Sequence, residues 1–203
     1  MARALRPAAE PFVSPIQVDQ VMEAAERGAL VECARRTKKK VYLKAGPGED
    51  TARAGIDPQL VGQPELSEVI ARQLLPDTDL NAGGVVYDQW LTAALVAATE
   101  YQYVAQLLTE SEVVTIYGVA TLDANPGISR VRLVRDAATI LAQWDATPVW
   151  AAGQPMGISD EYALFKGTET INIFLMPFLT KAGGERFILL GFQAEPKGNI
   201  ITV

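Results

Sequence analysis

The chain has 203 residues, a formal net charge of −6 at pH 7, one cysteine and no histidine. Without histidine, serine–histidine and cysteine–histidine catalysis and every histidine-liganded metal site are excluded, and a single cysteine excludes an internal disulfide and a thiolate metal cluster. Paired carboxylates and oxygen-liganded cations are the site chemistry that this composition leaves open.

The charge is distributed unevenly along the chain. Residues 1–53 carry a net charge of +3 and residues 54–203 a net charge of −9. A basic end on an acidic body is typical of a segment that meets polyanions, or of complementary surfaces that meet each other.

The first 28 residues are expected to form an irregular arm and a helix. Two prolines interrupt residues 1–13, which predicts an arm without regular structure. Ser14 is a suitable N-cap, apolar residues follow it at helical spacing, and Gly28 is suited to a helix end. We therefore predict an N-terminal arm and helix over 1–28, followed by a single domain over 29–203.

The next segments give weaker patterns. Residues 30–36 and 38–46 resemble two short strands of a hairpin, and a glycine- and proline-rich loop follows over 46–63. Apolar residues at helical spacing predict a second helix over 64–75. Residues 85–108 fit a strand and then a helix, although their second part also fits a long strand.

From residue 112 onward the pattern is that of short strands separated by turn signals. The candidate strands are 112–122, 129–135, 139–150, 161–167, 169–179, 185–195 and 199–203. The short links between them favour antiparallel neighbours, and many such strands in one domain form a sandwich or a barrel. We therefore predict a mainly β protein, an antiparallel jelly-roll β-sandwich with two or three helices in its N-terminal half.

One candidate strand carries cations on alternate positions. Arg130 and Arg132 fall on one face of an extended chain, whereas Val131 and Leu133 fall on the other. Arginine is enriched at protein interfaces, and the acidic body of a neighbouring copy would offer carboxylates. We predict subunit contacts for these two arginines and for Arg135, Trp144 and Trp150. The tryptophans fit the core of the domain equally well.

The strongest basic run lies near the middle of the N-terminal half. It consists of Arg35, Arg36, Lys38, Lys39 and Lys40. Such a cluster can bind the phosphates of a polyanion, but it is also typical of a solvated turn or a charged sheet edge. We favour the second interpretation, because the run lacks the interleaved aromatic residues on which bases stack.

The C-terminal half resembles the jelly-roll coat proteins of tailless icosahedral viruses and phages. The segments that carry this resemblance are SRVRLVRDAATILAQWDATPVWA, LFKGTETINIFLMPFL and ERFILLGFQAEPKGNIITV. The resemblance implies a jelly roll that assembles into a shell with copies of itself and with other coat proteins. It also implies a location in the virion, assembled in the host cytoplasm, and an N-terminal arm that reaches a neighbour, the genome or an inner membrane.

We therefore expect a structural, self-assembling protein without catalysis, cofactor, bound metal or small-molecule substrate. Two alternatives remain at this stage. A carbohydrate-binding or hydrolytic β-sandwich would need exposed tryptophans or two carboxylates at catalytic separation. A nucleic-acid-binding module would need the basic run at 35–40 on an exposed face.

Overall fold

The computed structural model describes residues 3–7, 15–43, 67–76, 79–80 and 90–198. Within them the helices are α1 (Pro15–Thr37) and α2 (Thr147–Ala151). The strands are β1 (Arg3–Ala4), β2 (Arg6–Pro7), β3 (Val69–Gln73), β4 (Tyr101–Leu107) and β5 (Val113–Thr121). They continue with β6 (Ile128–Arg135), β7 (Thr139–Asp145), β8 (Met156–Lys166), β9 (Thr170–Pro177) and β10 (Phe187–Pro196).

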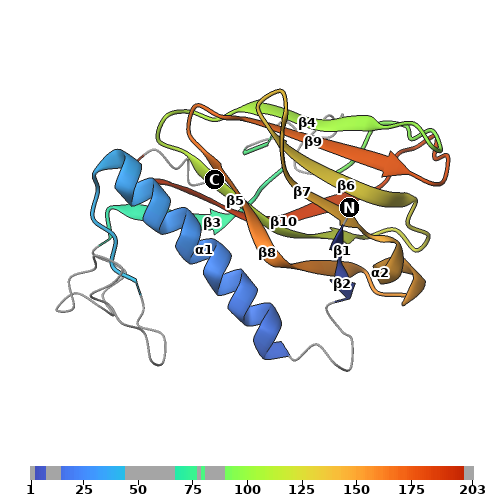
Figure 1. Cartoon of the computed structure of the whole chain (residues 1–203), viewed down its shortest axis with the longest axis horizontal. Helices are drawn as coiled ribbons and strands as arrows, with labels where there is room; N and C mark the ends of the chain where they lie inside the picture. The colour runs from blue at the N-terminus through green and yellow to red at the C-terminus, as the bar shows by residue number, and fades with distance from the viewer. Residues whose placement is uncertain (1–2, 8–14, 44–66, 77–78, 81–89, 199–203) are drawn as a thin grey trace.

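Two packed sheets make up the body of the protein (Figure 1). Apart from the short strands β1 and β2, one sheet has the order β7-β6-β9-β4 and the other β8-β5-β10-β3, with antiparallel neighbours throughout. Because the chain changes sheet at almost every link, strands that pair are far apart in sequence, as β3 and β10 are. Eight strands wound in this way form a jelly roll, so the predicted fold is confirmed.

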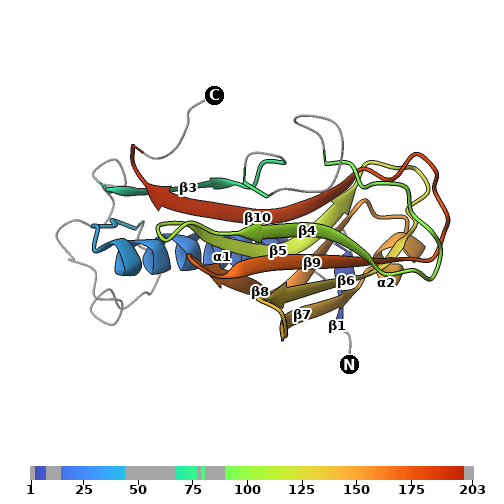
Figure 2. The same cartoon turned by 90° about the horizontal axis from the view of Figure 1, so that it is seen from above.

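The main core lies between the two sheets. Its largest fully buried side chains include Trp144, Tyr103, Phe165 and Phe187, each at most 1% exposed. The Tyr103 hydroxyl donates a hydrogen bond to the Phe187 carbonyl oxygen at 2.8 Å, which satisfies its one polar group inside the core. Seen from above, the strands of both sheets run along the long axis of the molecule (Figure 2).

Helix α1 covers the outer face of the β8-β5-β10-β3 sheet, which we call the helix-covered sheet (Figure 1). Ala25, Ala29 and Cys33 recur every four residues on the buried side of the helix, and each is 0% exposed. These small side chains allow a close approach, and the Thr115 hydroxyl of β5 donates to the Ala25 carbonyl oxygen at 3.1 Å. We call the β7-β6-β9-β4 sheet the open sheet, because in the described part of the chain α1 lies on the other side of the sandwich.

The first helix is longer than the sequence predicts. Gly28 was expected to end it, but α1 continues to Thr37, so the predicted strand over 30–36 is wrong. Gly28 lies inside the helix because the Tyr162 ring occupies the space beside it: a Cβ at Gly28 would lie 2.4 Å from the Tyr162 hydroxyl oxygen. The helix ends where Lys38 adopts a positive φ of 54° and the Lys39 amide bonds back to the Ala34 carbonyl oxygen.

The predicted helix 64–75 is also wrong, because its residues 69–73 form β3. Residues 92–108, which fit both a helix and a long strand, form β4 over 101–107. Each segment pairs with a distant strand, β10 or β9, and this long-range pairing outweighs the local spacing of apolar residues. The described N-terminal half therefore contains one α-helix, and the second helix, α2, lies in the C-terminal half.

The strands predicted between residues 112 and 195 correspond to β5, β6, β7, β8, β9 and β10. One of them is too long, because β7 ends at Asp145 and Thr147–Ala151 form α2, with Pro148 in its first turn. The predicted strand 199–203 and the predicted loop 46–63 lie outside the described residues.

Candidate functional site

The outer face of the open sheet carries the two predicted arginines. In the pairing of β6 with β9, Arg130 lies opposite Met176 and Arg132 opposite Phe174. The four side chains therefore share one face, which we call the arginine face. Arg130 is exposed, and Arg132, Phe174 and Met176 are partly exposed.

Arg132 is held in place by two neighbours. Its guanidinium carbon lies 4.6 Å from the centre of the Phe174 ring, a cation–π arrangement. The same guanidinium forms a two-point ion pair with Glu100, in which Nε and Oε1 are 3.2 Å apart. The arginine face thus presents a cation whose orientation is fixed before any partner binds.

Arg135 does not continue this row. Its guanidinium lies 3.5 Å from Glu169, whose carboxylate also accepts the Lys166 amide at 2.8 Å. Strict alternation would turn Val134 outward, but Val134 is 4% exposed, and the pairing of β6 with β7 shifts register between Leu133 and Val134. The irregularity places Arg135 at the end of the strand, where it pairs with the turn between β8 and β9.

The tryptophans lie in or against the core. Trp144 is 1% exposed and packs between the sheets, so its side chain belongs to the core of the subunit, and its predicted subunit contact stays a prediction. Trp150 is partly buried, and its indole N–H donates to the Ile128 carbonyl oxygen at 2.6 Å. Trp90 is partly buried against the same core cluster. The exposed aromatic platform that a carbohydrate-binding domain needs is therefore not provided by these side chains.

The basic run 35–40 lies at the C-terminal end of α1 and just beyond it. Arg35 pairs with Glu32 at 2.6 Å, and Arg36 donates to the Gly167 carbonyl oxygen at 3.0 Å. Cations at this end of a helix complement its dipole, which gives both arginines a structural role. Lys38, Lys39 and Lys40 are exposed and remain the accessible part of the predicted polyanion site.

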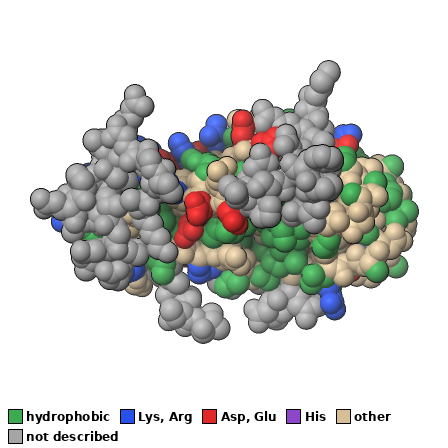
Figure 3. Space-filling view, turned by 90° about the horizontal axis from the view of Figure 1, so that it is seen from below, with side chains coloured by type: hydrophobic (Ala, Val, Ile, Leu, Met, Phe, Trp, Pro, Cys, Tyr) green, Lys and Arg blue, Asp and Glu red, His purple; other side chains and the backbone are tan. Residues whose placement is uncertain are grey.

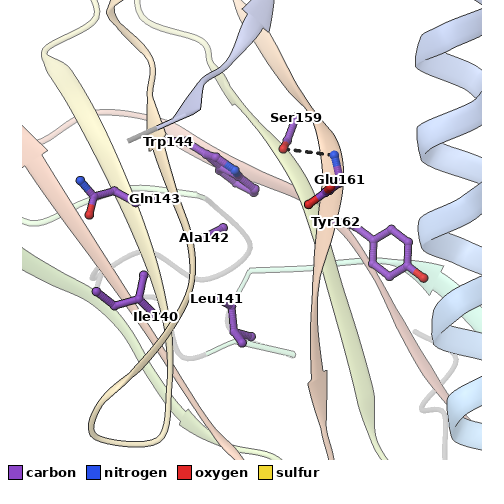
Figure 4. Close-up of a pocket in the computed structure, with 8 residues that line it drawn as sticks. All are labelled: Ile140, Leu141, Ala142, Gln143, Trp144, Ser159, Glu161 and Tyr162. Carbon is purple, nitrogen blue, oxygen red and sulfur yellow. Dashed lines mark hydrogen bonds between the residues drawn. The ribbon is translucent and has the colours of Figure 1, made fainter. Parts of the chain in front are cut away.

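A pocket of about 300 Å³ lies between the edge strands β7 and β8 (Figure 4). The described residues that line it are Ile140, Leu141, Ala142, Gln143, Trp144, Ser159, Glu161 and Tyr162. Its polar groups include the Ser159 hydroxyl, which accepts the Glu161 amide at 3.4 Å, and a single carboxylate, that of Glu161. Glycoside hydrolysis requires two carboxylates, so this lining does not supply that chemistry.

Two buried ionic clusters are not predicted from the sequence. The Glu185 carboxylate, at 0% exposure, accepts the Gly127 amide at 2.6 Å and the Thr121 hydroxyl at 3.2 Å, and Lys181 lies 3.1 Å away. The Asp79 carboxylate, also 0% exposed, pairs with Arg72. Both clusters tie loops to strands, and nothing in the sequence distinguishes Glu185, which precedes Arg186, or Asp79 from exposed carboxylates of turns.

A third carboxylate, Glu195, lies near Arg72 of the second cluster, and its pKa is shifted. Burial raises the pKa of Glu195, and the nearby Glu112 carboxylate raises it further, while Arg72 at 3.7 Å opposes the shift.

In the described ranges, no group of three or more acidic or cysteine side chains is placed to hold a metal ion. No helix in the described part of the chain has the length and apolar character needed to cross a membrane.

Large apolar side chains are also exposed on the described surface. They are Ile70, Leu75, Val96, Leu107, Leu122, Ile140 and Phe178. Figure 3 shows the side of the molecule seen from below, where hydrophobic side chains gather next to acidic ones. Exposed apolar area is thus not confined to the arginine face.

Comparisons with known proteins do not assign a family. No protein-family model and no curated protein matches the chain. Among solved structures, the Podospora anserina GH26-CBM35 β-(1,4)-mannanase is similar at 10% sequence identity and a TM-score of 0.29, over 66% of this chain and 29% of that chain. The chain spans less than a third of that protein's length, and similarity at this level carries no argument about fold or function.

Proposed function

We propose that the protein is a structural subunit that assembles with copies of itself into a shell, as the coat proteins of icosahedral viruses do. The observation that carries the proposal is the asymmetry of the jelly roll. One sheet is covered by α1 of the same chain, whereas the other presents the arginine face to its surroundings. Jelly rolls are a recurrent architecture of viral capsid domains.

The chemistry of the arginine face suits a protein partner. Arginine, aromatic residues and methionine are enriched in the buried centres of interfaces, and Arg132, Phe174 and Met176 are of these types. Because Phe174 and Glu100 already orient Arg132, little side-chain entropy is lost when a partner carboxylate binds it. An acidic body with a net charge of −9 over residues 54–203 offers such carboxylates on a second copy.

One end of the sandwich supplies a second surface for subunit contact. The β5–β6 and β9–β10 loops meet there, since the Phe178 amide donates to the Gly127 carbonyl oxygen at 2.7 Å. Leu122 and Phe178 project from these loops at 66% and 46% exposure. Apolar side chains of this size at a loop cluster are typical of surfaces that become buried on assembly.

Electron microscopy of the purified protein tests the proposal directly. We expect closed particles or regular arrays, and we expect static light scattering to report multimers whose mass rises with protein concentration. A subunit that stays monomeric at millimolar concentration, in both low and physiological salt, would show that the protein is not a shell component.

A further inference from the structure

A lysine and two carboxylates meet at the end of the sandwich where the β5–β6 and β9–β10 loops come together. The Lys181 Nζ lies 3.0 Å from Oδ2 of Asp123, which follows β5, and 3.1 Å from Oε2 of Glu185, which precedes β10. Asp123 and Lys181 are 58 positions apart in the sequence. One ammonium group is therefore in direct contact with two carboxylates, and one of these comes from a distant part of the chain.

The two carboxylates differ in their surroundings. The Glu185 side chain is 0% exposed and also accepts the Gly127 amide and the Thr121 hydroxyl, whereas the Asp123 side chain is 30% exposed. The Thr121 hydroxyl in turn accepts the Asp123 amide at 3.2 Å, so one side chain positions both acidic residues. A buried carboxylate within hydrogen-bond distance of an ammonium group is placed to take up its proton and to return it.

The backbone around these side chains is fixed by hydrogen bonds to a neighbouring segment. The amides of Lys181 and Leu95 each donate to the carbonyl oxygen of the other residue at 2.9 Å. The Glu185 amide donates to the Thr92 hydroxyl at 2.8 Å, and the Thr92 amide donates to the Glu185 carbonyl oxygen at 2.9 Å. Groups held in contact in this way react as if at a very high concentration.

We propose that Lys181 and Asp123 form an intramolecular isopeptide bond, with Glu185 as the catalytic residue. The Lys181 Nζ forms a bond to the Asp123 Cγ, and one carboxylate oxygen of Asp123 leaves as water together with two protons of the ammonium group. Glu185 takes the first of these protons, which frees the nitrogen lone pair for the attack, and returns it to the departing oxygen. Glu185 ends unchanged, and the step needs no oxidant, reductant or further reactant.

The product suits the site. The charges of Lys181 and Asp123 are replaced by a neutral amide, whose N–H lies next to Glu185 and adds a donor to the Gly127 amide and the Thr121 hydroxyl. The bond closes a loop that contains β6, β7, β8 and β9, and such a cross-link restricts the unfolded chain as a disulfide does. The inference concerns the single subunit and does not depend on the proposed function.

Mass spectrometry of the denatured, full-length wild-type protein tests the proposal without any variant. We expect a mass that is lower than that of the sequence by one water molecule. We also expect trypsin to leave the chain uncut after Lys181 and to release the fragment that holds Asp123 joined to the fragment that holds Lys181. Trypsin should still cut after Lys166, which lies 3.7 Å from Glu32 as an ordinary ion pair. A wild-type chain at its full sequence mass would overturn the proposal.

Three variants assign the bond to its residues. Lys181→Arg and Asp123→Ala each remove one partner, so both chains should have their full sequence mass. Glu185→Gln keeps both partners but removes the group that accepts the proton, and we expect at least about tenfold slower formation of the bond. Loss of water that persists in Lys181→Arg would show that the water comes from another reaction, and this would contradict the proposal. Equal rates in Glu185→Gln and the wild type would disprove the role of Glu185.

Discussion

The two sheets of the sandwich differ because α1 covers the outer face of only one of them in the described part of the chain. The burial patterns of their central strands differ accordingly. Strand β5 of the helix-covered sheet is buried at all nine positions, because the core lies on one side and α1 on the other. Strand β9 of the open sheet alternates between partly exposed and buried at all eight positions. The comparison shows that one sheet is completed within the chain, and that the other still presents a patterned face to its surroundings.

The two faces also use different side chains. Under α1 the contacts are short and apolar: Ala25, Ala29 and Cys33 face Tyr117 and Phe192, whose rings stack 5.9 Å apart. On the arginine face two side chains, Arg130 and Arg132, are long and charged, and Arg132 is oriented by Phe174 and Glu100 on the same surface. Substitutions on the covered side should therefore affect folding, and those on the open side should affect association.

The largest effect is expected at the centre of the helix cover. Ala29→Asp places a carboxylate at a position that is 0% exposed, among apolar side chains that offer it no cation. An uncompensated buried charge costs about 3–5 kcal/mol, which would lower the free energy of unfolding by a large part of its typical total. Urea denaturation followed by circular dichroism measures the change.

The same helix offers a matched control for this substitution. Ala24 is exposed on α1, so Ala24→Asp introduces the same side chain into the same helix and should change the free energy of unfolding by about 0.5 kcal/mol or less. If the two variants had equal stability, α1 would not be packed on the sheet as described.

An intermediate effect is expected from the Cys33 thiol on the buried side of α1. Burial raises the pKa of Cys33 to about 11, and the Glu195 carboxylate contributes to the shift. The unfolded chain releases this proton near its ordinary value of 9.0, whereas the folded chain retains it until about pH 11. The stability contributed by the neutral thiol is therefore present below pH 9 and is lost as the pH rises towards 11, by about 2–3 kcal/mol.

Denaturation curves for the wild type and for Cys33→Ala between pH 8 and 11 measure this contribution. The variant lacks the thiol but keeps every other group that titrates in this range. Its stability should fall less steeply with pH than that of the wild type. Parallel curves for the two proteins would mean that the thiol is accessible to water.

The smallest effect on folding is expected on the arginine face. Arg130→Glu with Arg132→Glu removes the contacts of Arg132 with Glu100 and Phe174, at a cost of about 1–2 kcal/mol to the subunit. The same change reverses the charge that the proposed function assigns to subunit contact. We therefore expect a folded variant that no longer forms particles in electron microscopy or multimers in light scattering.

The exposed lysines of the basic run provide the control for this variant. Lys38→Glu with Lys39→Glu changes the net charge by the same amount at a distant surface. It should assemble as the wild type does. If both double variants lost assembly equally, net charge rather than the arginine face would govern association.

The predictions from the sequence were accurate for the six strands from β5 to β10, and they failed at β3 and at the C-terminal end of α1, where local spacing fits more than one structure. The alternation of Arg130 and Arg132 with Val131 and Leu133 correctly placed β6 with its arginines outward. The sequence could not decide between a helix and a strand for β4, because its apolar residues fit both periods and only its pairing with β9 decides between them.

The candidate site could be predicted only in part for a related reason. Arg130 and Arg132 were identified from the alternation in their own strand. The partners of Arg132, Glu100 and Phe174, come from distant parts of the chain, which only the jelly-roll pairing brings together. Trp144 could not be assigned to core or surface, because an aromatic residue suits both until the register of β7 is known.

The contact between Gly28 and Tyr162 has a mechanical consequence. Tyr162 belongs to the bulged part of β8, and its ring rests directly against the helix backbone at Gly28. The path of this edge strand and the seating of α1 on the sheet are therefore not independent: a change in the curvature of the strand presses on, or releases, the middle of the helix.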